Sequence, residues 1–456
     1  MNLKKVIILL LSLVMISTCF SCQSLSQKEL TQSQKDWIDD IQQIRKAFAK
    51  VEGINEFLSD KDRNNRLDYL VKKIQKDNWD TREIVYYLRE IISDIRIAHI
   101  YFGVPAEYQN IEKLDSYILA GEWFGDDFVI FAAEDDYADC IGSALVAING
   151  KSLEKVIKEF DRIMFNETDI YLKALFENEL SKNGLLKSDL EYLGIINKKD
   201  DAVVFTFEKD GNQYEKLISP INLYGSEGFN IVYFDELDVN FPKTYEMYLK
   251  HPLYDYFIDK EKRALYFQYN ECIDATTYGG GPEYPYFDKF FDEMMSDYFA
   301  NKEFVDYFVF DLRHNTGGSE NLWNAAASKY LNDFRMITMK VLIGKHTFSA
   351  GVDAIDTTLV LFPHARLYGE ETGLAIHNYT DIRPTTLEKT GSELWLPTHA
   401  DFSTAINKRA ADLSRGVFPD VEIIRYYSDF FMELIQFTKS ALKTSSFLKL
   451  TFFYKA

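Results

Sequence analysis

The sequence predicts a multidomain protein of the mixed helix and sheet class, with an α/β core in its C-terminal half. Its 456 residues exceed the length of one ordinary domain, so two or three domains are expected. Residues 37–113 carry apolar side chains at helical spacing, whereas residues 114–225 alternate short strands with turns. In residues 226–456, most clearly from Leu265, apolar strands alternate with amphipathic helices, which is typical of an α/β core.

The composition indicates a globular chain without a nucleic-acid partner. Hydrophobic residues make up 46% of the chain and aromatic residues 15%, which is enough for packed cores. The formal net charge of -20 repels phosphate groups, so nucleic acid is excluded as an electrostatic ligand. No spacing of Cys and His is typical of a metal site, and we expect neither a metal ion nor another cofactor.

Residues 1–22 have the three parts of an export signal. Two lysines precede the apolar run Val6 to Ile16, which is too short to span a bilayer, and small residues then lead to Cys22. The segment resembles a bacterial lipoprotein signal, which implies a lipid on Cys22, with Cys19 as the alternative; a plain secretory signal is a further alternative. Residues 23–36 are rich in Ser and Gln and predict a polar tether. We therefore expect export to the bacterial cell envelope and a lipid anchor in a membrane.

The two regions that follow are predominantly structural. Residues 37–113 predict core-facing helices and then a β-rich run that contains His99, which from chemistry alone is a half-buried strand histidine. In residues 114–225 an inserted helical pair, Leu172 to Leu193, interrupts the strands. An export signal permits a disulfide between Cys140 and Cys272, but buried free cysteines are common, and their pairing stays open.

A strand followed by a glycine turn is the first candidate for a catalytic element. Tyr307 to Phe310 is an apolar strand, and Asn315-Thr-Gly-Gly318 directly after it contains residues that tolerate positive φ. Glycines also let a substrate approach bare backbone N–H groups. Such a turn can form an oxyanion hole.

A serine at a strand-to-helix junction is the second candidate. Met339 to Ile343 predicts a strand and Gly351 to Leu361 a helix, with Thr347-Phe-Ser-Ala350 between them. At such a junction the Oγ of Ser349 and the next N–H point the same way. That arrangement suits a nucleophile.

Four motifs stand together in the order found in a known family. They are Asp311-Leu-Arg-x-Asn-x-Gly-Gly318, Thr347-Phe-Ser-Ala350, Gly369-Glu-Glu-Thr-Gly373 and Gly416-Val-Phe-Pro-Asp420. The series resembles that of the tail-specific, or C-terminal-processing, serine peptidases. The resemblance implies a crotonase-like α/β core over residues 226–456 and a PDZ-like domain over residues 114–225. It also implies Ser349 as the nucleophile, with the N–H groups of Ala350 and of Gly317 or Gly318 as the oxyanion hole.

The general base is expected to be a histidine. Many family members use a lysine shortly after the third motif, but here the nearest lysine is Lys389. A branch that resembles the tricorn core peptidase uses a histidine just after the N-terminal helices, and His99 is similar in placement. An imidazole, with an ordinary pKa of about 6.5, suits this task. His346 and His377 are the alternatives.

The acid that would orient the base is expected near the fourth motif. In the tricorn-like branch it is a glutamate three residues before Gly416, where this sequence has Leu413. Asp412 is the expected substitute, and Glu370 or Glu371 are alternatives.

Together these residues predict an exported serine endopeptidase that acts through an acyl-enzyme on Ser349, with His99 as general base and a peptide or unfolded protein as substrate. Two other functions stay open on the same fold. One is a catalytically impaired peptide-binding lipoprotein, and the other is a binding protein for small hydrophobic ligands. The sequence gives no oligomeric state.

Overall fold

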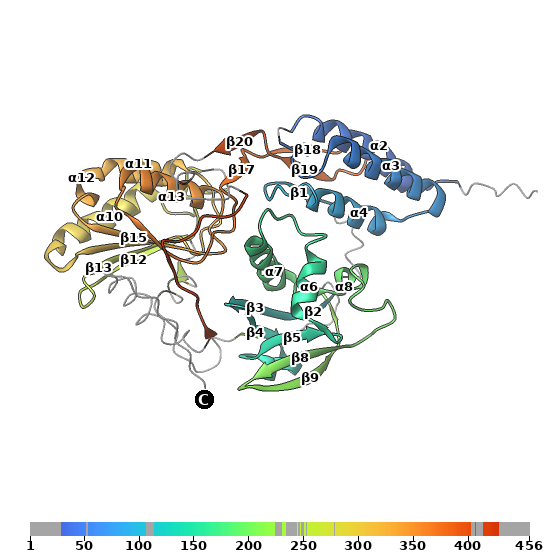
Figure 1. The fold of residues 1–456 in the computed structure, drawn as a ribbon, viewed down its shortest axis with the longest axis horizontal. Coiled ribbons are helices and arrows are strands. Elements are labelled where there is room, and N and C mark those ends of the chain that lie inside the picture. Colours follow the sequence, from blue (N-terminus) through green and yellow to red (C-terminus); the bar gives the residue numbers. More distant parts are fainter. Residues whose placement is uncertain are drawn as a thin grey trace, which may run out of the picture.

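The computed structural model describes residues 29–427, except residues 52, 106–113, 224–229, 234–243, 245–246, 248–249, 252, 278, 403–405 and 407–413. Three bodies pack against one another: a helical bundle, a β-rich domain and an α/β core (Figure 1). Cys22, Cys19 and Asp412 lie outside the described residues. Within the described ranges, no helix is long and apolar enough to cross a membrane.

The helical bundle consists of α2 (Gln32–Phe48), α3 (Asp60–Asp77) and α4 (Thr81–Ser93). Each helix follows a residue whose side chain accepts a backbone N–H of the first turn; these are Thr31, Ser59 and Asp80. The predicted apolar stripe faces inward, and its buried residues include Trp37, Ile41, Ile44, Phe48 and Leu88. The helices therefore form because each one can bury a face against the others.

A segment of the C-terminal half, residues 383–396, completes the bundle; we call it the excursion. β18 (Arg383–Thr386) pairs with β19 (Glu393–Leu396), which pairs with β1 (Tyr101–Gly103) next to the helices. Three leucines of the excursion belong to the same apolar core as α2, α3 and α4: Leu387, Leu394 and Leu396. His99 lies in a turn before β1 and not on the strand that the sequence predicts, because the Ile100 N–H donates to Ile97 O at 3.1 Å and closes a turn around it.

The β-rich domain is built on a seven-stranded sheet in the order β11-β4-β5-β8-β9, in which β3 also pairs with β4 and β6 with β5. The strands are β3 (Leu119–Phe124), β4 (Asp127–Glu134), β5 (Ala144–Ile148), β6 (Lys151–Ser152), β8 (Val203–Lys209), β9 (Asn212–Ile218) and β11 (Ile231–Tyr233). A small second sheet joins β10 (Ile221–Asn222), β2 (Asp115–Tyr117) and β7 (Leu185–Leu186). The pairing of β11 extends this domain beyond residue 225.

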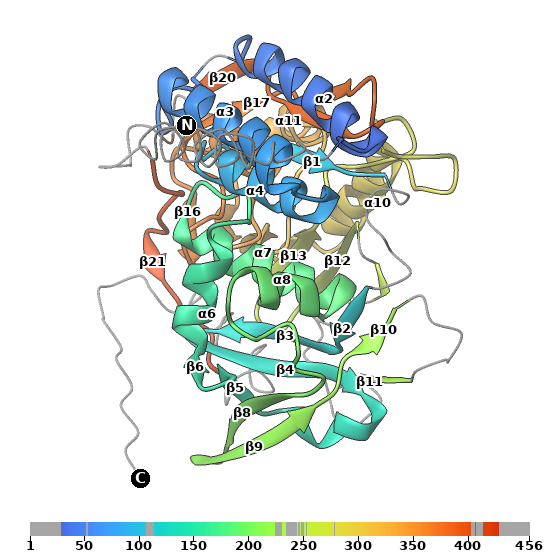
Figure 2. The same ribbon diagram turned by 90° about the vertical axis from the view of Figure 1, so that its right-hand side faces the viewer.

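Three helices cover the large sheet: α6 (Leu153–Phe160), α7 (Asp169–Asn183) and α8 (Lys187–Tyr192). They lie on the side that faces the helical bundle (Figure 2). The 161–168 loop, which joins α6 to α7, therefore lies next to the turn that contains His99. The side chain of Ser93 donates to Asp161 O and to Met164 O, and Arg96 binds both carboxylate oxygens of Asp161.

The α/β core has a six-stranded sheet in the order β12-β13-β14-β15-β16-β21, parallel except for the pairing of β12 with β13. The strands are β12 (Tyr254–Asp259), β13 (Ala264–Tyr269), β14 (Tyr307–Asp311), β15 (Thr338–Ile343), β16 (Arg366–Gly369) and β21 (Val421–Glu422). The helices are α10 (Phe287–Ala300), α11 (Asn321–Lys329), α12 (Leu331–Phe334) and α13 (Ala350–Leu361). Because parallel strands end at the same edge of a sheet, the segments after β14 and β15 meet there.

The two cysteines within the described residues are separate free thiols. Cys140 is buried in the core of the β-rich domain and Cys272 in that of the α/β core. Burial raises the pKa of Cys140 to about 11 and that of Cys272 to about 12. Both thiols are therefore protonated and unreactive at neutral pH.

Candidate active site

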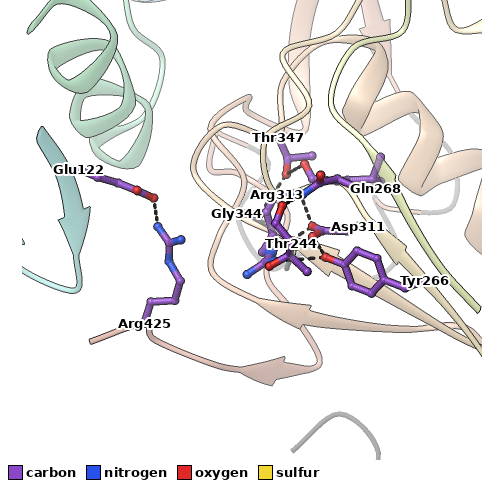
Figure 3. A network of polar contacts seen from close by, with 10 residues as sticks. Glu122, Thr244, Tyr266, Gln268, Asp311, Arg313, Gly344, Thr347 and Arg425 are labelled. Carbon is purple, nitrogen blue, oxygen red and sulfur yellow. Dashed lines mark hydrogen bonds and ion pairs between the residues drawn. The ribbon is translucent and has the colours of Figure 1, made fainter. Parts of the chain in front are cut away.

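A buried ion pair shapes the chain after β14. The Arg313 side chain donates to the two carboxylate oxygens of Asp311 at 3.0 and 2.8 Å, and Tyr266 donates to the same carboxylate (Figure 3). Burial would raise the pKa of Asp311, but the charge of Arg313 outweighs it and lowers the pKa below its usual range. Asp311 therefore stays ionised and fixes the direction in which the glycine turn leaves the strand.

Asn315 holds the glycine turn against the end of β13. This fully buried side chain donates from Nδ2 to Tyr269 O at 2.7 Å and accepts the Gly317 N–H on Oδ1 at 3.0 Å. Cys272 N–H in turn donates to Gly317 O at 2.7 Å. The turn is therefore tied on both sides and its geometry is fixed before any substrate binds.

Two backbone N–H groups in and next to the glycine turn have no acceptor among the described residues. The N–H of Gly317 is engaged by Asn315, whereas no described residue accepts the N–H of Gly318 or of Ala350. A Cβ on Gly317 would lie 2.6 Å from Ser349 Cβ and 3.2 Å from Ala350 N, so the turn and the serine are in direct contact. Of the two glycines considered from the sequence, Gly318 is the one with an available donor.

Replacement of Gly317 by Ala is expected to lower turnover by about 100-fold or more, because the new methyl group would displace the Ser349 side chain and crowd the oxyanion position. Steady-state hydrolysis of a peptide substrate measures this. Gly194→Ala is the matched control: Gly194 also has a positive φ, 66°, but a Cβ there meets nothing within 4 Å. If both variants lose the same activity, backbone strain and not proximity to Ser349 is the cause.

Gly318 does not offer the same test. Its Cβ would lie 2.4 Å from Cys272 O, inside the backbone of the neighbouring segment. A side chain at Gly318 therefore disturbs the fold itself. A side chain at Gly317 would therefore collide with Ser349, whereas one at Gly318 would collide with the backbone of Cys272.

Ser349 occupies a strained position at the start of α13. Its φ of 50° and ψ of -129° are rare for a residue with a side chain. The preceding loop is held by Thr347, whose hydroxyl donates to Leu312 O at 2.7 Å and accepts the Gly344 N–H at 3.0 Å. The chain thus reverses sharply between β15 and α13, and Ser349 lies half-buried on the bend.

His99 is the residue that meets the Ser349 hydroxyl. His99 Nε2 lies 3.1 Å from Ser349 Oγ, although 250 residues separate the two in sequence. The imidazole ring packs on Phe348, with ring centroids 4.7 Å apart, and Tyr171 of α7 stacks on Phe348 at 4.4 Å. Burial lowers the pKa of His99 to about 4, so the ring is neutral at pH 7.

Comparison with solved structures shows that the fold of this chain is known. Mature CPAF complexed with lactacystin matches with a TM-score of 0.61 and 11% identity, over 91% of this chain and 98% of that chain. A second structure of mature CPAF has the same TM-score and identity, over 92% and 100%. The chain has the CPAF fold. The predicted class, with helical, β-rich and α/β parts, is confirmed by this match.

The other comparisons do not support an argument about the fold or the function. The photosystem II D1 C-terminal processing protease has a TM-score of 0.38 and 12% identity, over 87% of this chain and 94% of that chain. The sequence matches no protein-family model and no curated protein. At 11% identity the likeness to CPAF extends to the fold alone, so the chemistry has to come from this chain's own residues.

Within the CPAF fold, the alternative acids and bases have other partners. Glu371 binds Arg415 at 2.6 Å and accepts the Gly416 N–H at 2.9 Å. His346 Nε2 lies 3.0 Å from Glu177 Oε1, and His377 is on β17 (His377–Thr380), which pairs with β20 (His399–Phe402). Among the described candidates, His99 is the residue whose side chain lies within hydrogen-bonding distance of Ser349 Oγ.

Buried charges connect the core to the β-rich domain close to Ser349. Lys345 and His346, just before the serine, lie 3.4 and 3.0 Å from the carboxylate of Glu177 in α7. Farther along the interface, Glu122 of β3 pairs with Arg425 (Figure 3). Burial raises the pKa of Glu122, but the charge of Arg425 outweighs it and lowers the pKa to about 2. Such pairs fix the relative position of two bodies more than they stabilise the fold.

Sequence reasoning missed the 161–168 loop. Glu167 Oε1 accepts the N–H of Ala98 at 3.0 Å, and Glu167 Oε2 accepts the N–H of Ala375 at 3.3 Å. Thr168 Oγ1 donates to Gly373 O at 2.7 Å. No motif marks this loop, since its role depends on two segments that are distant in sequence.

Proposed function

We propose that this protein is an exported serine endopeptidase that cleaves peptide bonds through an acyl-enzyme on Ser349. The observation that carries the proposal is the 3.1 Å contact between Ser349 Oγ and His99 Nε2, next to the open N–H groups of Gly318 and Ala350. A nucleophile, a base and two oxyanion donors then meet at one point. The CPAF fold and the motif resemblance to tail-specific peptidases support the same reaction.

In the proposed reaction, Ser349 Oγ attacks a peptide carbonyl carbon while its proton passes to His99 Nε2. The carbonyl oxygen becomes an oxyanion and accepts the N–H groups of Gly318 and Ala350, each of which stabilises the transition state by about 3 to 4 kcal/mol. The C–N bond then breaks, and His99 returns the proton to the leaving amine. Water repeats the attack on the acyl ester and releases Ser349.

A surface hollow in the β-rich domain supports a peptide or unfolded protein as the substrate. It has a volume of about 1150 Å³ and lies between β5 and the start of α6. Apolar residues of its wall include Val129, Leu145, Leu153 and Ile157. A groove of this kind suits an extended chain, which is the ligand expected for a PDZ-like domain.

A fluorophosphonate probe tests the proposal directly, because it modifies only an activated serine. Labelling that maps to Ser349, together with hydrolysis of an unfolded protein substrate, is the expected result. Lactacystin, present in the CPAF complex, serves as a second ligand to compete with the probe. Absence of both labelling and hydrolysis would contradict the peptidase function.

One observation favours a second function, that of an impaired peptide-binding protein. Although His99 Nδ1 is buried, it has no hydrogen-bond partner among the described residues, where an acid would orient the base of a fully active enzyme. This function predicts peptide binding in the absence of turnover. Peptide titration of a protein that the probe does not label would establish it.

We also propose that the mature protein is anchored in a membrane of the cell envelope through a lipid on Cys22. Cys22→Ser is expected to move the protein from the membrane fraction to the soluble fraction and to abolish palmitate labelling. Cys19→Ser is the matched control and should leave both unchanged. Labelling that survives Cys22→Ser would assign the lipid to Cys19.

A further inference from the structure

We propose that Glu167 is the acidic positioning residue of the Ser349–His99 pair, in the place that sequence reasoning gave to Asp412. This inference rests on the proposed function. Glu167 belongs to the 161–168 loop of the β-rich domain, far in sequence from the motifs of the core. It would act through His99 and not on the substrate.

The contacts of Glu167 fix the two segments that must be aligned for catalysis. One carboxylate oxygen holds the N–H of Ala98, the residue before His99, and the other holds Ala375 in the segment after the third motif. Thr168 binds Gly373 in that same segment. A single carboxylate therefore connects the turn of the base to the core that carries Ser349.

Glu167 has a second role in this proposal, which is to stabilise the protonated form of His99 with its negative charge. His99 carries no charge in the resting site, and its Nδ1 has no described partner. When His99 takes the proton of Ser349, it becomes an imidazolium in a buried environment, which is unfavourable without a nearby anion. Glu167 accepts the N–H of the adjoining residue Ala98, and we assign it the role of that anion.

The ionisation of Glu167 sets the pH range in which its carboxylate can stabilise the His99 imidazolium. Burial raises its pKa to about 8, and Glu56 adds to the shift, while the two N–H bonds oppose it. Since the pKa is raised, the carboxyl group is mainly protonated at pH 6 and becomes a carboxylate as the pH passes through about 8. We therefore expect turnover to increase over this range.

The other charged groups around Glu167 do not account for such an increase. Arg96 is paired with Asp161, and burial raises the pKa of Tyr171 far above this range. Glu56 accepts the Tyr379 hydroxyl at 2.7 Å. Near the glycine turn, however, Glu271 accepts the Thr316 hydroxyl, and burial raises the pKa of Glu271 to about 7. The experiment therefore has to distinguish the titration of Glu167 from that of Glu271.

The test is the pH profile of kcat/KM from pH 5.5 to 9.5 for the full chain and its variants. Glu167→Gln is expected to lose on the order of 10- to 100-fold at pH 9 but about threefold or less at pH 6, so that the inflection near pH 8 disappears. Thr168→Val, which loosens the same loop and keeps the charge, should lower the rate equally at all pH values and retain the inflection. Glu271→Gln should also retain it.

The outcomes separate this inference from the proposed function. An active wild-type enzyme whose inflection survives Glu167→Gln, or is lost in Glu271→Gln, overturns the role of Glu167 alone. A wild-type protein that neither hydrolyses peptides nor reacts with fluorophosphonate overturns the peptidase function. Thermal unfolding of Glu167→Gln shows whether a lost inflection reflects a lost fold, and Glu167→Asp, which restores the charge, should recover the pH dependence.

Discussion

Replacement of Ser349 by Ala is expected to reduce peptide hydrolysis by at least about 10⁴-fold, because the attacking oxygen and the bond of the acyl-enzyme are both lost. The fold should persist, since among the described residues the Ser349 side chain bonds to His99 alone and the strained bend is made by the backbone. Initial rates on an unfolded protein substrate, with far-UV circular dichroism of the same samples, measure the two effects separately.

Ser296→Ala is the control for the nucleophile. Ser296 is exposed on α10, so its loss should leave the rate unchanged. Residual activity of Ser349→Ala within tenfold of wild type would mean that another nucleophile is used. Fluorophosphonate labelling of Ser349→Ala would lead to the same conclusion.

Replacement of His99 by Ala is expected to lower kcat by about 10⁴-fold with little change in KM, since the base acts on the proton of Ser349 and not on substrate binding. Tyr171 and Phe348 stay stacked without the imidazole, so we expect the thermal unfolding midpoint to shift by only a few degrees.

The control for the base is His251→Ala, a histidine whose side chain is 60% exposed and distant from the site in sequence. It should not change kcat. If His99→Ala keeps near wild-type kcat, the 3.1 Å contact with Ser349 is structural, and a different base operates.

The parts of the molecule that local patterns govern could be predicted from the sequence. The strand and glycine turn at residues 307–318 and the strand, bend and helix at residues 338–361 follow from hydrophobic runs and small residues, and the structure has them as β14, β15 and α13. Parallel pairing of β14 with β15 then brings the two segments together. Periodicity likewise predicted the helices of the bundle.

The parts that depend on distant contacts could not be predicted in this way. Nothing near Glu167 indicates that its carboxylate binds Ala98 and Ala375, because neither partner is local. Nor does the run around Arg383 to Leu396 reveal that it leaves the core to pair with β1. For His99, the resemblance to a family indicated a role that chemistry alone did not.

The same excursion has a consequence for the order in which the protein assembles. The apolar core of α2, α3 and α4 stays incomplete until Leu387, Leu394 and Leu396 are present, so these helices need a segment that is synthesised about 300 residues later to finish folding. Contacts of such long range form slowly. His99 precedes β1, which pairs with β19, and we therefore expect the His99–Ser349 pair to form only after residues 393–396 have been synthesised. A chain that ends between Ser349 and Leu387 would therefore contain both residues without the segment that completes the core next to His99.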